Sequence, residues 1–209
     1  SPPNAPGADF KATTREQFWA KYQYQREDRP LRDFLAQTSV YAIWDDHEVT
    51  GDFAGPSEPL MPLGLQAFWN YFPFSVVNHQ SHRLYRSFRW GQHLELFILD
   101  TRQYRSPNTQ PDGPEKTMLG ATQLKWLLEG LTSSTATWQV IVSSVPLAAQ
   151  TGNATRGHDS WAGGSFPGGF ENELEKIVTA LQRAHKRNVV WLSADIHVAR
   201  AFAYDPDQH

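Results

Sequence analysis

The sequence predicts a layered α/β fold with a mixed sheet, and three segments support this. Two stretches, 124–145 and 174–193, carry apolar residues at helical spacing followed by an apolar strand. This alternation is typical of parallel strands joined by helices. The segment 84–99 has the pattern of two strands joined by a tight turn at Gly91, which is an antiparallel hairpin. Because both kinds of pairing are expected in one chain of 209 residues, we predict a single α/β domain with a mixed sheet.

The first third of the chain is expected to be mainly helical. A capping box formed by Thr13 with Glu16, or by Thr14 with Gln17, can start a first helix. Pro30 is placed to open a second helix at its first turn. The other elements expected in this part are an apolar strand over 40–44, a Gly- and Pro-rich loop over 51–62 and a short aromatic helix over 65–71.

The second half alternates helices and strands. Apolar residues fall at positions i, i+3, i+4 and i+7 from Leu124 and again from Leu174, and each set predicts a helix with one apolar face. Strands follow at 138–145 and 189–193, and the loop 152–169 is rich in glycine. Only about five strands are visible, which is few for two stacked sheets, so we expect an upstream segment to supply more.

Composition excludes several classes of function. The net charge of -3 provides no basic face, which excludes a role as a nucleic-acid scaffold. No apolar run approaches the roughly 20 residues of a membrane helix. Cysteine is absent, so neither a disulfide nor a thiolate ligand is expected. The chain starts at Ser1 without a signal-peptide pattern, and we expect it to be cut from a longer protein that carries the targeting signal.

Carboxylate and imidazole groups follow two of the predicted strands. The strand over 40–44 runs into Asp-Asp-His-Glu at 45–48, and the strand over 189–193 runs into Asp-Ile-His at 195–197. The carboxyl ends of neighbouring strands meet at one edge of an α/β sheet, where ligands bind. Carboxylates with imidazole and no thiol are the ligand set of a hydrolytic di-metal centre for fairly hard cations.

Each motif has a specific expected role. One of two adjacent Asp side chains can bind a metal while the other orients a ligand or a water. His47 is suited to contact a phosphoryl oxygen or to protonate a leaving group. In an extended chain Asp195 and His197 point to the same side, so both can reach one ion. The alternative for 45–48 is an acidic loop whose Asp side chains cap the next element. A zincin motif is excluded because Gly51 stands where the second His would be.

Five ordered motifs together resemble the PhoD-like family of alkaline phosphatase/phosphodiesterases, within the calcineurin-like metallophosphoesterase superfamily. The motifs are WDDHEV (44–49), LYRSFRWG (84–91), LDTRQYR (99–105), QLKWL (123–127) and LSADIH (192–197). The similarity covers nearly the whole chain from about residue 14. It implies a layered αββα sandwich with mixed sheets, incomplete in this chain. It also implies that residues 1–209 are the C-terminal portion of a single catalytic domain, and that the protein is periplasmic or secreted.

The resemblance implies a ligand set and metals. Asp46 and His47 stand where the superfamily has an Asn-His pair, and Asp195 and His197 stand where it has a His-x-His pair. With Asp45 as an added carboxylate, the implied metal ligands are Asp45, Asp46, Asp195 and His197. The implied metals are Ca²⁺ and Fe³⁺, with Mn²⁺ or Zn²⁺ as alternatives. The family's earlier segment, which has a Cys and a Gly-Asp-x-x-Tyr motif, does not occur here, so a missing N-terminal segment is expected to complete the site.

Two further segments could contribute to the site. Arg102 and Tyr104 follow the second hairpin strand, and a guanidinium there could hold phosphate oxygens in bidentate fashion. The alternative is that Asp100 and Arg102 form a structural pair. The segment 159–161 resembles another family segment and is expected to be structural, with His158 beside it as a possible substrate contact.

Three functions follow from these motifs. The first is a phosphoric ester hydrolase, acting on a phosphomonoester or phosphodiester with a metal-activated water, in which His47 and Arg102 are catalytic. The second is a catalytically incomplete fragment or non-catalytic subdomain that packs against a partner. The third keeps the metal but cleaves another bond, as in a lactonase or amidase.

Overall fold

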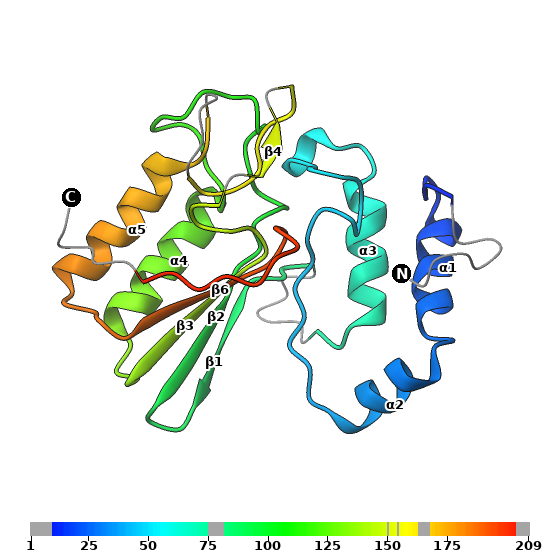
Figure 1. Cartoon of the computed structure of the whole chain (residues 1–209), viewed down its shortest axis with the longest axis horizontal. Helices are drawn as coiled ribbons and strands as arrows, with labels where there is room; N and C mark the ends of the chain where they lie inside the picture. The colour runs from blue at the N-terminus through cyan, green and yellow to red at the C-terminus, as the bar shows by residue number, and fades with distance from the viewer. Residues whose placement is uncertain (1–9, 75–81, 150, 154, 163–167, 204–209) are drawn as a thin grey trace.

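The structure is a computed structural model that describes residues 10–74, 82–149, 151–153, 155–162 and 168–203. Figure 1 shows two groups of helices: α4 and α5 lie against the sheet, and α1, α2 and α3 are gathered on the opposite side of the molecule. The mixed α/β class predicted from the sequence is confirmed.

The main sheet has four strands in the order β1-β2-β3-β6. They are β1 (Arg86–Trp90), β2 (Leu94–Ile98), β3 (Trp138–Ser143) and β6 (Val189–Ser193). β1 and β2 are antiparallel, whereas β2, β3 and β6 are parallel, so the sheet is mixed as expected. Gly91 makes the hairpin turn with φ of 57°, a left-handed conformation that costs glycine little.

Two helices cover one face of this sheet. α4 (Gly120–Ser133) connects β2 to β3, and α5 (Glu171–Arg183) connects β3 to β6. The core between helices and sheet contains buried apolar side chains from both layers: Phe97, Leu127, Leu131, Ile141, Trp161, Ile177 and Leu181. The apolar faces predicted from the spacing after Leu124 and Leu174 therefore lie against the sheet. Burial of such an apolar face is the main source of stability for these helices.

Glu173 of α5 holds the start of α4. Its Oε1 accepts hydrogen bonds from the backbone N–H groups of Met118 at 3.1 Å and Leu119 at 2.9 Å, and its Oε2 accepts from the Thr117 hydroxyl. A buried carboxylate at a helix N-terminus supplies acceptors to otherwise unpaired N–H groups. The two covering helices are thereby joined at one end.

The first three helices pack on one another. α1 (Arg15–Gln25) lies against α3 (Met61–Tyr71), with Tyr22 stacked on Tyr71 at 4.9 Å between ring centroids. Of the two capping boxes considered, the one formed by Thr14 and Gln17 is present. α2 (Arg29–Gln37) follows the N-cap residue Asp28 and has Pro30 in its first turn, as expected.

The predicted strand over 40–44 is wrong. This segment forms no strand in the described structure. Its contacts to β1 come from side chains: Arg86 Nη2 donates to the Ala42 carbonyl at 2.7 Å, and Tyr41 packs on Phe88 at 4.4 Å. An apolar run predicts burial, but a strand also requires a neighbouring backbone to pair with.

The aromatic helix is also longer than expected, since α3 begins at Met61 rather than near 65.

The other face of the main sheet is apolar and open. Trp138 and Leu192 on this face have 48% and 54% of their surface exposed, and Val190 is also exposed. In the register of β3 and β6, Val140 lies beside Val190 and Val142 beside Leu192. The second sheet of the expected αββα layering is not formed by the described residues, whose only other sheet is a two-stranded ribbon. That ribbon, β4 (Gly152–Asn153) with β5 (Gly157–His158), lies within the loop expected over 152–169.

In the part of the chain that the structure describes, no helix is both long enough and apolar enough to cross a bilayer.

Candidate metal centre

Three carboxylates meet beside the carboxyl ends of the parallel strands. One oxygen each from Asp45, Asp46 and Asp195 lies within 4.8 Å of the others. Asp195 follows β6, while the other two follow the extended segment 40–44. The sequence motifs thus come together from opposite ends of the chain. The argument from strand ends holds for Asp195, which follows β6, but not for Asp45 and Asp46, because the segment before them is not a strand.

Ser144 connects the two segments that carry these carboxylates. It directly follows β3, and its hydroxyl donates to the carbonyl of Trp44 at 2.6 Å. The backbone N–H of Ala194 donates to the Ser144 carbonyl at 3.2 Å. Trp44 is fully buried, and its Nε1 donates to Asp100 Oδ1 at 2.8 Å. The residues preceding Asp45 and Asp195 are therefore both hydrogen-bonded to one buried serine, which the sequence motifs did not indicate.

Asp46 stabilises a turn and also belongs to the carboxylate cluster. Its Oδ2 accepts the backbone N–H of Asp52 at 2.8 Å, while Glu48 Oε2 accepts that of Asp45 at 2.7 Å. The alternative of an acidic capping loop therefore describes part of this segment. Burial raises the pKa of Glu48, although the hydrogen bond from the backbone N–H of Asp45 opposes this rise. One oxygen of Asp46 closes the turn, and its Oδ1 remains on the side of His47.

Asp195 has the side chain of the cluster that most needs a positive partner. No group among the described residues donates a hydrogen bond to its buried Oδ2. Burial, and then the neighbouring charge of Asp45, raise the pKa of Asp195 to about 6. A carboxylate that is buried, unpaired and close to like charges is unfavourable unless a cation compensates it. An oxygen-only donor set of this kind suits hard cations, so the residues fit the metals that the motifs implied.

Arg102 does not face a pocket. Its guanidinium is fully buried, and Nε donates to Asp45 Oδ1 at 2.8 Å. Nη1 and Nη2 donate to the two oxygens of Asp159 at 2.7 and 2.6 Å, and Nη1 also donates to the Phe53 carbonyl at 3.2 Å. The expectation of an arginine open to phosphate is therefore not met. The alternative, a structural pair of Asp100 with Arg102, is present only through the backbone: Asp100 Oδ1 accepts the N–H of Arg102 at 3.1 Å, whereas the guanidinium binds Asp45 and Asp159.

Asp159 is the centre of the buried network behind the carboxylates. Arg102 binds it in bidentate fashion, Arg105 Nη1 donates to Oδ1 at 2.5 Å, and Asn108 Nδ2 donates to Oδ1 at 3.1 Å. Burial by itself would raise the pKa of Asp159, but Arg105 and Arg102 outweigh burial and lower it to about 2. Buried charges need such partners, so this carboxylate draws Arg102 inward. Arg105 is the last residue of the LDTRQYR motif and Asn108 lies three residues after it, but nothing in the sequence indicated their contacts with Asp159.

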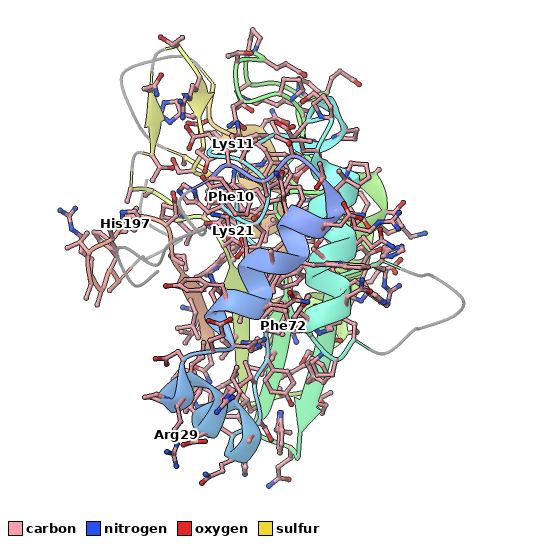
Figure 2. All side chains as sticks on the ribbon, turned by 90° about the vertical axis from the view of Figure 1, so that its right-hand side faces the viewer. Phe10, Lys11, Lys21, Arg29, Phe72 and His197 are labelled. Carbon is pink, nitrogen blue, oxygen red and sulfur yellow. The ribbon has the colours of Figure 1, made fainter. Side chains whose placement is uncertain are left out.

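The two histidines of the motifs, His47 and His197, are exposed and lie outside the carboxylate cluster. His47 is 81% exposed at the side chain, and its Nε2 lies 4.0 Å from Asp46 Oδ1, so it stands at the rim of the cluster. His197 is exposed and is not part of the cluster. Figure 2 shows it at the outer edge of the molecule. The argument that an extended chain points Asp195 and His197 the same way is wrong, because their φ values are 74° and 52°, both left-handed.

The other two candidate side chains also point elsewhere. Tyr104 packs edge-on against Tyr85 at 5.9 Å between ring centroids. His158 is buried within β5. The segment 159–161 is structural as expected, with Trp161 fully buried and its Nε1 donating to Ser143 at 3.1 Å.

The comparison with known families agrees with this geometry. Residues 2–209 match the family described as PhoD-like phosphatase. The chain belongs to this family. It is 28% identical over 215 residues to alkaline phosphatase D of Bacillus subtilis (strain 168), covering 90% of this chain and 36% of that protein. A solved structure titled "Structure of PhoD" superposes with a TM-score of 0.73 at 26% identity, covering 89% of this chain and 40% of that one. The chain thus spans well under half the length of either relative.

Proposed function

We propose that this chain carries part of the catalytic centre of a metal-dependent phosphoric ester hydrolase that acts on phosphomonoesters or phosphodiesters. The observation that carries the proposal is the cluster of Asp45, Asp46 and Asp195 with the unpaired, buried Oδ2 of Asp195. Membership of the PhoD-like phosphatase family supports the phosphate ester as substrate and an extracytoplasmic location.

The three clustered aspartates would hold the metal, and Ca²⁺ and Fe³⁺ suit their oxygen donors, with Mn²⁺ or Zn²⁺ as alternatives. When bound, metal ions polarise the phosphoryl oxygens and lower the pKa of a water that serves as the nucleophile. His197 is the fourth proposed ligand, and it would have to turn inward from its exposed position.

The remaining residues act around this cluster. His47 stands at the rim with an exposed imidazole, where it can give a proton to the leaving oxygen or stabilise developing charge. Arg102 is better suited to positioning than to contact with substrate, because its guanidinium fixes Asp45 Oδ1. The hydroxyl and the carbonyl of Ser144, through their hydrogen bonds to Trp44 and Ala194, join the two segments that carry the proposed ligands.

Asp195→Asn tests the proposal. The amide keeps the shape of the carboxylate but removes its charge, so we expect loss of tight metal binding and of turnover of a p-nitrophenyl phosphate. Metal content by mass spectrometry and the rate at alkaline pH would measure this. Asp33→Asn, an exposed position of α2, is the matched control and should change neither. Retention of both metal and turnover in the Asp195 variant would exclude this site.

A second candidate is a subdomain that packs against a partner and performs no chemistry by itself. The open apolar face around Trp138 and Leu192 favours it. Metal titration separates the two candidates, because two or more tightly held ions per chain would argue against a non-catalytic unit. The third candidate, a lactonase or amidase, is separated by comparing phosphate monoesters and diesters with a carboxyl ester at alkaline pH.

A further inference from the structure

Arg156 lies at the rim of the carboxylate cluster, on the side of Gly51. A Cβ built on Gly51 would lie 3.7 Å from Arg156 Nη1, 4.0 Å from Asp46 Oδ2 and 4.0 Å from His47 Cε1. A side chain at position 51 would therefore stand between the guanidinium, the imidazole and the clustered carboxylate, and glycine leaves that position open. The exposed cation thus lies beside one member of the cluster and beside His47.

Arg156 differs from Arg102 in its exposure to solvent. Its side chain is 62% exposed, whereas that of Arg102 is completely buried. Asp52 Oδ2 accepts from Arg156 Nη1 at 3.1 Å and orients the group. A planar guanidinium with exposed N–H groups is the side chain best suited to bind phosphate oxygens in a fixed direction.

The loop that carries Arg156 is held in place at its base. Asn153 Oδ1 accepts the backbone N–H groups of Thr155 and Arg156, both at 3.0 Å. Gly157 has φ of 82°, and a Cβ there would lie 2.4 Å from the Asn108 carbonyl, so only glycine allows this approach. Asn108 in turn donates to the carbonyl of Asp52 at 3.1 Å. The hairpin is thus joined to the turn that positions Asp46.

We propose that Arg156 binds the phosphoryl group of the substrate at the rim of the carboxylate cluster, beside Asp46 and His47. This inference rests on the proposed function and adds a preference within it. Arg156 attracts a dianionic phosphomonoester more strongly than a monoanionic diester, because the Coulomb energy scales with the charge of the ligand. Arg156 therefore favours monoesters.

The test compares Arg156→Gln with the unchanged chain, both saturated with metal. We expect the dissociation constant for inorganic phosphate, measured by calorimetry, to rise about tenfold or more, as expected for loss of a charge-assisted contact. The kcat/KM for a p-nitrophenyl monoester should fall by a similar factor through KM, and that for a bis-p-nitrophenyl diester should fall less. Arg156→Lys keeps the charge without the planar fork and should restore part of the loss.

Arg29→Gln is the matched control, because Arg29 is also an exposed arginine paired with an Asp. It lies in α2, which Figure 2 shows at the lower end of the molecule, apart from His197, and its replacement should leave phosphate binding unchanged. Metal content must be equal in all variants. Unchanged phosphate affinity in Arg156→Gln, or no phosphate binding by the unchanged chain, would overturn the role of Arg156. Phosphate binding that depends on Arg156, without turnover of any phosphate ester, would instead contradict the proposed function.

Discussion

The hydroxyl of Ser144 donates to the carbonyl of Trp44 at 2.6 Å, although the two residues lie 100 positions apart. The carbonyl of the same serine accepts from Ala194. Trp44 immediately precedes Asp45, and Ala194 immediately precedes Asp195. The distance between the two halves of the carboxylate cluster is therefore set by a residue that carries no charge and lies at the end of the central strand β3.

Ser144→Ala should weaken metal binding more than its effect on the fold would suggest. The substitution leaves the buried Trp44 carbonyl without this donor, which costs about 1–3 kcal/mol of unfolding free energy. It also frees Asp45 to move relative to Asp195, so the metal dissociation constant should rise. Urea unfolding and metal titration measure the two effects.

Ser133→Ala at the end of α4 is the control for this experiment. Its hydroxyl donates to the Glu129 carbonyl within its own exposed helix end, away from β6 and the cluster. A loss of stability in Ser144→Ala with an unchanged metal dissociation constant would limit Ser144 to a structural role.

Asp159 should make stability depend on acid pH. Its folded pKa of about 2 is below the ordinary value of 3.8, so its carboxylate stabilises the fold above pH 4. This contribution, about 2 kcal/mol, should be lost as the pH falls from 4 toward 2. Urea unfolding at a series of pH values measures it.

In Asp159→Asn, the free energy of unfolding should no longer show the decrease between pH 4 and 2 that is attributed to this carboxylate. The variant should also be less stable by about 3–5 kcal/mol at neutral pH, since Arg102 and Arg105 would remain buried without their carboxylate. A variant whose stability falls between pH 4 and 2 as steeply as that of the unchanged chain would show that other carboxylates cause the acid sensitivity.

Gly130→Ala should destabilise the chain even though alanine favours helices. The new Cβ in α4 would lie 2.6 Å from Phe97 Cε1 of β2, so either the ring or the helix must shift. Overpacking of this kind costs about 1–3 kcal/mol, which exceeds the gain of about 1 kcal/mol in helix propensity. Thermal unfolding measures the balance.

Gly113→Ala provides the comparison, because nothing lies within 4 Å of its added Cβ. It should leave the midpoint of thermal unfolding nearly unchanged. A rise in the midpoint for Gly130→Ala would show that Phe97 moves aside at little cost.

Much of the fold could be predicted from local patterns. The spacing of Leu124, Leu127 and Leu131 predicted a helix with this face buried, and α4 has this orientation in the structure. The residues around Gly91 predicted the hairpin that β1 and β2 form. Patterns of this kind report which face of an element is apolar, and burial of that face is the main contribution to stability. The segment 40–44 shows the limit, since its apolar run predicts burial but says nothing about a strand partner.

The sequence by itself determined that acidic motifs follow two distant apolar segments, and the alternation of helices and strands in the second half of the chain brings Asp195 to the carboxyl ends of the parallel strands. Only the tertiary structure decided that the segment before Asp45 reaches this edge through Ser144 without forming a strand, and that Asp159 takes Arg102 away from solvent. It also decided that His197 turns outward and that Arg156 comes to lie beside Asp46. The contacts of Trp44 with Ser144 and of Arg102 with Asp159 join residues that lie 100 and 57 positions apart. No local pattern encodes such contacts, because they are decided by the cost of leaving a polar or charged group unpaired inside the folded chain.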